Sequence, residues 1–138
     1  MRSTLRIVTI LMGAGFALQG VGWLVAPDRA AATLGMPVLD GLARSTQFGD
    51  FAAFFLTLGL SILAGSASGR GRLLYFPAAL LASAAFGRVV AWAVHGAAFA
   101  TTFILVEIGA SLLLLAAMCA STAATAGGGK NLGGTQAR

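Results

Sequence analysis

Phe86-Gly87-Arg88-Val89-Val90-Ala91-Trp92-Ala93-Val94-His95 places an arginine inside an apolar run that is long enough to cross a membrane. An arginine at the centre of a membrane helix is unfavourable by roughly 2.5–3.5 kcal/mol, so it normally faces a bundle interior and pairs with a carboxylate. Asp50 and Glu107 are the carboxylates that fall within other predicted membrane segments. The sequence therefore predicts a charge cluster inside a helix bundle.

The composition is that of an integral membrane protein. The chain has 138 residues, of which 58% are hydrophobic and 9% charged, and its mean hydropathy is +0.89. Soluble domains carry about 25% charged residues. Four spans of about 20 residues with short connections use nearly the whole length. No room is left for a separate soluble catalytic domain.

We expect an all-α, antiparallel four-helix membrane bundle formed by residues 1–120. The predicted spans are residues 6–26, 44–65, 73–95 and 99–120. The connection Pro27–Asp40 contains two prolines and has room for a short interfacial helix through residues 30–32. Residues 121–138, rich in Gly, Thr and Ala, are predicted to be a disordered cytoplasmic tail.

The first span could be read as a secretory signal peptide, because basic residues precede it. The apolar core of a signal peptide is typically about 7–15 residues long. Here the run Ile7–Val25 is longer, and no clean small-residue cleavage site follows it. We therefore favour a retained helix, with cleavage left open. Gly13, Ala17 and Gly20 give this helix small surfaces for close packing against a neighbour.

The basic residues predict the orientation. By the positive-inside rule, the side of the membrane with more Lys and Arg is cytoplasmic. Six basic residues lie on the side of the N-terminus and two on the other, so both termini are predicted to be cytoplasmic; the six are Arg2, Arg6, Arg70, Arg72, Lys130 and Arg138, and the two are Arg29 and Arg44. These residues are scattered in ones and twos, which argues against a nucleic-acid-binding surface.

The three membrane-embedded charges lie at a similar depth. Counted along ideal helices, Asp50, Arg88 and Glu107 each fall about 9–12 Å inside the non-cytoplasmic face. Glu107 is the preferred partner of Arg88, because a tight turn at Gly96 makes the third and fourth spans antiparallel neighbours and the two residues are nearly equidistant from it.

Further polar residues share faces with these charges. Trp92 and His95 follow Arg88 at i+4 and i+7, Gln47 precedes Asp50 at i+3, and Ser111 lies one turn beyond Glu107. The predicted ligand-binding or charge cluster is therefore Arg88, Glu107, Asp50, Gln47, Trp92, His95 and Ser111.

This cluster has more than one interpretation. Arg88 could simply bridge the carboxylates as a clamp with no ligand. Alternatively, the cluster binds a polar or anionic head group, or relays protons, since two carboxylates and one arginine leave a spare acid. His95 alone is also explained as a polar cap at a helix end.

We predict no cofactor and no metal site. His95 is the only histidine and Cys119 the only cysteine, so the usual ligand sets of zinc, haem and iron–sulfur centres cannot be assembled. No nucleophile–base motif is present, and no catalytic residue is predicted. A non-enzymatic role is therefore favoured over an enzyme.

Several short motifs resemble those of a known family. They are Gly87-Arg88, His95-Gly96, Glu107 and the weaker Gln47-Phe48-Gly49-Asp50, in a region covering residues 5–118. The chain resembles the small bacterial membrane proteins grouped as domain of unknown function 4345, and more loosely the DoxX-like four-helix proteins. The resemblance implies a four-helix architecture in the bacterial inner membrane but no activity. DoxX-like proteins are associated with redox or sulfur metabolism, for which this chain lacks a cysteine pair.

The predicted function is that of an accessory subunit, or of a binder of a lipid-like or polar small ligand at the Arg/Asp/Glu cluster. Membrane lipids, and a homodimer or larger membrane complex, are the expected partners. A proton-coupled transporter acting as a dimer is the first alternative. The second is an intramembrane acid/base enzyme that uses Glu107 or Asp50.

Overall fold

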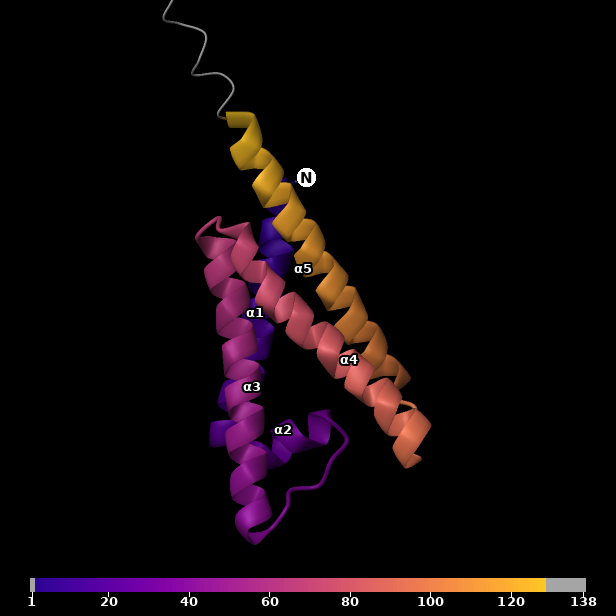
Figure 1. Cartoon of the computed structure of the whole chain (residues 1–138). Helices are drawn as coiled ribbons and strands as arrows, with labels where there is room; N and C mark the ends of the chain where they lie inside the picture. Colours follow the sequence, from indigo (N-terminus) through magenta and orange to yellow (C-terminus); the bar gives the residue numbers. More distant parts are fainter. Residues whose placement is uncertain (1, 129–138) are drawn as a thin grey trace, which may run out of the picture.

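Long helices make up nearly all of the chain. The computed structural model describes residues 2–128. This part of the chain contains five α-helices and one 3-10 helix, and no strand (Figure 1). The elements are α1 (Arg2–Val25), α2 (Pro27–Thr33), α3 (Gly41–Ala67), η1 (Gly71–Leu74), α4 (Tyr75–His95) and α5 (Thr101–Gly128). The predicted all-α class is confirmed.

Four helical segments are long and apolar enough to cross a membrane. They are Ser3–Val25, Gly41–Ala67, Gly71–His95 and Thr101–Thr122, close to the four predicted spans. Large apolar side chains on these helices point outward, such as Leu18, which is 70% exposed, and Leu42, which is 84% exposed. Outward-facing apolar surface of this kind suits lipid as the surrounding solvent. The chain thus has the features of a multi-pass membrane protein.

Helices α1 and α3 form a tightly packed antiparallel pair. A Cβ atom added to Gly59 would lie 2.6 Å from the carbonyl oxygen of Gly13, and one added to Gly20 would lie 2.7 Å from the backbone nitrogen of Leu56. The two backbones therefore approach as closely as glycine allows. At the other end of the pair, the Ser66 hydroxyl donates to Thr9 Oγ1 at 2.9 Å.

Helices α4 and α5 form a second antiparallel pair. We call the α1–α3 pair and the α4–α5 pair the two hairpins. Gly96 ends α4 with φ +67°, a left-handed conformation that glycine adopts without steric cost. The Ala97 N–H donates back to the carbonyl oxygen of Ala91 at 3.2 Å. Further along the hairpin, the buried Ser111 hydroxyl donates to the carbonyl oxygen of Ala78 at 2.9 Å.

The two hairpins meet at one end and diverge toward the other. Their shared core lies near η1 and joins α3, η1, α4 and α5 through Leu58, Ile62, Leu74, Ala78, Leu81, Ala110 and Leu114. A second core joins α1, α2 and α3 through Trp23, Ala30, Ala31, Ala52 and Phe55. In Figure 1 the α4–α5 hairpin leans away from α1 and α3 at the end far from the N-terminus, and α2 lies on the inner side of the opening.

Two of the differences from the predicted boundaries concern α2 and the end of α5. Helix α2 extends over Pro27–Thr33, with proline in its first turn, where its missing N–H is harmless. Helix α5 continues past residue 120 to Gly128. The Ser121 hydroxyl bonds back to the Met118 carbonyl at 2.7 Å, and the alanines that follow favour helix. The rest of the predicted tail, residues 129–138, lies outside the described residues.

Candidate ligand-binding site

A cavity of about 680 Å³ lies between the two hairpins. Residues from α1, α2, α3, α4 and α5 line it, and most of its wall is apolar. The wall includes five phenylalanines, namely Phe16, Phe51, Phe54, Phe55 and Phe103, and three charged side chains, namely Asp50, Arg88 and Glu107. Sites for small molecules typically have volumes of about 300–1,000 Å³ with apolar walls and a few polar groups. We call this space the inter-hairpin cavity.

Arg88 and Glu107 form an ion pair across the second hairpin. Arg88 Nε on α4 lies 2.9 and 3.1 Å from the two carboxylate oxygens of Glu107 on α5. The Glu107 side chain is 11% exposed and that of Arg88 is 36% exposed. The guanidinium carbon of Arg88 also lies 4.6 Å from the ring centroid of Phe103, in cation–π contact. Each charge is thus compensated within the hairpin, and Arg88 is held in one orientation.

Asp50 contributes a carboxylate from the opposite wall. It lies on α3, it is exposed, and it lines the same cavity. Within the described residues it has no hydrogen bond and no ion pair, whereas Glu107 has Arg88. The cavity therefore holds two carboxylates and one guanidinium, and the carboxylate of Asp50 is the one in excess.

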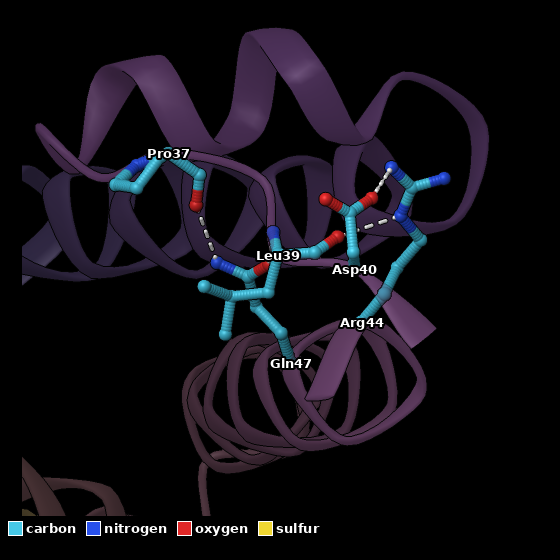
Figure 2. Close-up of polar contacts among 5 residues, drawn as sticks. All are labelled: Pro37, Leu39, Asp40, Arg44 and Gln47. Carbon is cyan, nitrogen blue, oxygen red and sulfur yellow. Dashed lines mark hydrogen bonds and ion pairs between the residues drawn. The ribbon is translucent and has the colours of Figure 1, made fainter. Parts of the chain in front are cut away.

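Gln47, which the sequence assigned to the cluster, instead fastens the loop before α3. Its side chain is buried and its amide nitrogen donates to the Pro37 carbonyl oxygen at 3.0 Å (Figure 2). Its amide oxygen accepts the Leu39 N–H at 3.0 Å. Beside it, Arg44 pairs with Asp40 at 3.0 Å. Backbone groups of this loop have no helical hydrogen-bond partners, and the Gln47 side chain bonds to two of them instead of facing the cavity.

The other three candidates also lie outside the cavity lining. Trp92 is 50% exposed and packs edge-on against Phe99 at 5.2 Å between ring centroids. His95, the last residue of α4, is exposed. The Ser111 hydroxyl donates its hydrogen bond to the backbone of α4. Of the seven candidates, the cavity brings together Arg88, Glu107 and Asp50.

Sequence reasoning missed two polar residues of the lining. The Gln19 amide nitrogen on α1 donates to Thr33 Oγ1 at 2.8 Å and to the Ala30 carbonyl oxygen at 3.3 Å, so it holds α2 beside the cavity. Gln19 is the only amide side chain in the first apolar run, which was the available signal. The aromatic wall also had a signal, since Phe51, Phe54 and Phe55 share one helical face at i, i+3 and i+4.

Comparisons of this chain with protein-family models, curated proteins and solved structures find no match. The resemblance to the domain of unknown function 4345 and to DoxX-like proteins stays a prediction. Within residues 2–128, no group of three or more His, Cys, Asp and Glu side chains is placed to hold a metal ion.

Proposed function

We propose that this chain is a non-enzymatic membrane protein that binds an amphipathic small molecule in the inter-hairpin cavity. The single observation that carries this proposal is the cavity itself, which sets a charged cluster of Asp50, Arg88 and Glu107 into a largely apolar wall of ligand-binding size. An amphipathic molecule matches both parts of the wall, with its polar group at the cluster and its apolar part against the phenylalanines.

The position of the cavity supports access from the non-cytoplasmic side. Its lining residues lie between positions 12 and 19 of α1, at 33 and 34 around the end of α2, between 50 and 55 of α3, between 81 and 88 of α4 and between 103 and 107 of α5. The cavity thus extends from the middle of the bundle toward the end away from the N-terminus. The six-to-two distribution of basic residues favours cytoplasmic termini. In the proposed arrangement, which includes the bacterial inner membrane as the location, the cavity lies in the outer half of the bilayer.

A matched pair of glycine substitutions tests the proposal. Gly15 lines the cavity, and a Cβ atom there would meet no atom within 4 Å, so Gly15→Leu is expected to fill the cavity without disturbing its helix. Gly109 on α5 is equally unobstructed but lies outside the lining, so Gly109→Leu is the control. Native mass spectrometry of protein purified in mild detergent measures the bound small molecules.

We expect the wild type and Gly109→Leu to carry the same small-molecule adduct, and Gly15→Leu to lose at least nine-tenths of it. Equal adduct occupancy in the two variants would contradict the proposal. So would the absence of an adduct from all three proteins, both as purified and after incubation with a lipid extract of the host membrane.

A proton-coupled transporter, acting as a dimer, is the second candidate. The observation that favours it is Asp50, an acid in the cavity with no partner among the described residues. For the acid/base enzyme, Glu107 is engaged by Arg88, so Asp50 is the one acid of the cavity without a partner among the described residues, and the geometry gives this alternative no acid and base pair.

A further inference from the structure

We infer that the molecule taken up by the inter-hairpin cavity is a hydrophobic organic cation, whose charge is held by Asp50 and the phenylalanine wall. This inference rests on the proposed function and names its ligand class. From the sequence alone, a polar or anionic head group at the cluster was one of the interpretations left open; the structure favours positive charge instead.

The charge balance of the cavity is the first argument. Arg88 is already compensated, because its Nε lies within 3.1 Å of both oxygens of Glu107 and its guanidinium lies over Phe103. An anion would have to share Arg88 with Glu107 and would face the carboxylate of Asp50. A cation would pair with Asp50, the carboxylate that the Arg88 guanidinium does not compensate, and would supply the partner that a charged side chain in a membrane segment requires.

The aromatic wall is the second argument. Phe51, Phe54 and Phe55 follow Asp50 on α3, and Phe16 on α1 stacks on Phe55 with ring centroids 6.2 Å apart. Aromatic ring faces carry negative electrostatic potential and attract cations within about 6 Å. The contact between Arg88 and Phe103 is already one example of this interaction at the cavity. Phenylalanines that line the same cavity as Asp50 are therefore suited to a positive charge that makes no hydrogen bonds.

The scarcity of other polar groups defines the cation further. Apart from the charged residues, the polar side chains of the lining are Gln19 and Thr33, and these bond to each other. A strongly hydrated ammonium with several N–H donors would lose hydrogen bonds to water that this wall does not replace. A bulky cation with shielded or delocalised charge loses few such bonds, and a volume of about 680 Å³ accommodates it.

Two ions of the same shape and opposite charge provide the test. Tetraphenylphosphonium and tetraphenylborate differ mainly in the sign of their charge, so equilibrium dialysis of each against the purified protein in a neutral detergent isolates the effect of charge. The variants are Asp50→Asn, Asp50→Glu and Gly15→Leu, with Asp28→Asn as the control that removes an exposed carboxylate outside the cavity lining. Size-exclusion profiles and helical circular dichroism establish that each variant is folded.

We expect the wild type to bind the phosphonium at least tenfold more tightly than the borate. Asp50→Asn should weaken phosphonium binding at least tenfold, Asp50→Glu should keep it within about threefold, and Asp28→Asn should not change it. The inference is overturned if the borate binds equally or more tightly, if Asp50→Asn binds the phosphonium like the wild type, or if Asp50→Glu loses binding as fully as Asp50→Asn.

The proposed function fails separately. If neither ion shows saturable binding that Gly15→Leu removes, the cavity itself is not a ligand site. If Gly15→Leu removes saturable binding but the charge preference is absent or reversed, the site stands and its assignment to cations does not.

Discussion

Two ion pairs of this protein have the same chemistry in different surroundings. Arg44 and Asp40 pair at 3.0 Å one helical turn apart, with side chains 51% and 94% exposed. Arg88 and Glu107 pair at 2.9 Å between two helices that are candidate membrane spans, and the Glu107 side chain is 11% exposed. An exposed pair contributes little to stability, whereas loss of one member of a buried pair leaves an uncompensated charge. Breaking the Arg88–Glu107 pair should therefore destabilise the protein more than breaking the Arg44–Asp40 pair.

We predict that Arg88→Leu lowers the free energy of unfolding in detergent by roughly 3 kcal/mol, at the low end of the range for a broken buried pair because Arg88 is partly exposed. The double variant Arg88→Leu/Glu107→Leu should be more stable than Arg88→Leu, because neither charge is then left alone. Arg44→Leu is the control and should change stability little. Thermal unfolding of these variants, of the wild type and of the single variant Glu107→Leu measures the effect. Strictly additive losses in the double-mutant cycle would show that Arg88 and Glu107 do not interact.

At the residue level, the sequence indicated the pairing of Arg88 but not the partners of Gln47. Arg88 and Glu107 lie at nearly equal distances from the Gly96 turn, so helix geometry alone favours that contact. The partners of Gln47 are the backbone groups of Pro37 and Leu39. They belong to an irregular loop whose path no periodicity predicts, so the i+3 spacing of Gln47 and Asp50 predicted a shared direction that the Gln47 side chain does not take.

Among the elements, α1 and α3 depend on glycine at their contact. Membrane helices gain little from the hydrophobic effect when they associate in lipid, so close backbone packing provides much of the attraction. Gly59 lies against the backbone of Gly13 and Ala17, while Gly49 on the same helix faces open space. The sequence indicated the small residues of α1, but it did not indicate that Gly59 would be their partner.

We predict that Gly59→Ala separates α1 from α3 and markedly lowers the melting temperature in detergent. The added methyl group cannot be accommodated, because the atoms nearest to it belong to the backbone of α1. Gly49→Ala, the control, should be neutral or slightly stabilising, since alanine favours helix by up to about 1 kcal/mol over glycine. Equal melting temperatures for the two variants would contradict the close packing described here.

The presence of each long helix was easier to predict than the residue at which it ends. Long apolar runs predict four spans because each must satisfy its own backbone hydrogen bonds in lipid. The extension of α5 to Gly128 was not predicted, because the composition of residues 121–138, rich in Gly, Thr and Ala, favoured a disordered tail. The hydroxyls of Ser121 and Thr122 instead bond to the Met118 carbonyl within the helix.

On the scale of the whole molecule, unequal packing creates the site. Each hairpin is packed along its own length, and among residues 2–128 the buried core that both hairpins share lies near η1. The inter-hairpin cavity fills the region where they diverge (Figure 1). The charged residues of this region were predicted from the sequence, but the divergence was not, because the relative tilt of two hairpins depends on side-chain packing at their contact and not on periodicity along one helix.

If four helices cross the membrane and place this cavity in its outer half, the two ends of the bundle lie on opposite sides of the membrane, and cysteine labelling distinguishes them. In a Cys119→Ala background, Asp28→Cys in α2 and Arg70→Cys in the loop before η1 put one thiol at each end of the bundle. We predict that a membrane-impermeant maleimide labels Asp28→Cys in intact spheroplasts and labels Arg70→Cys only after permeabilisation. Labelling of Arg70→Cys but not Asp28→Cys in intact spheroplasts, or equal labelling of both, would contradict this membrane topology.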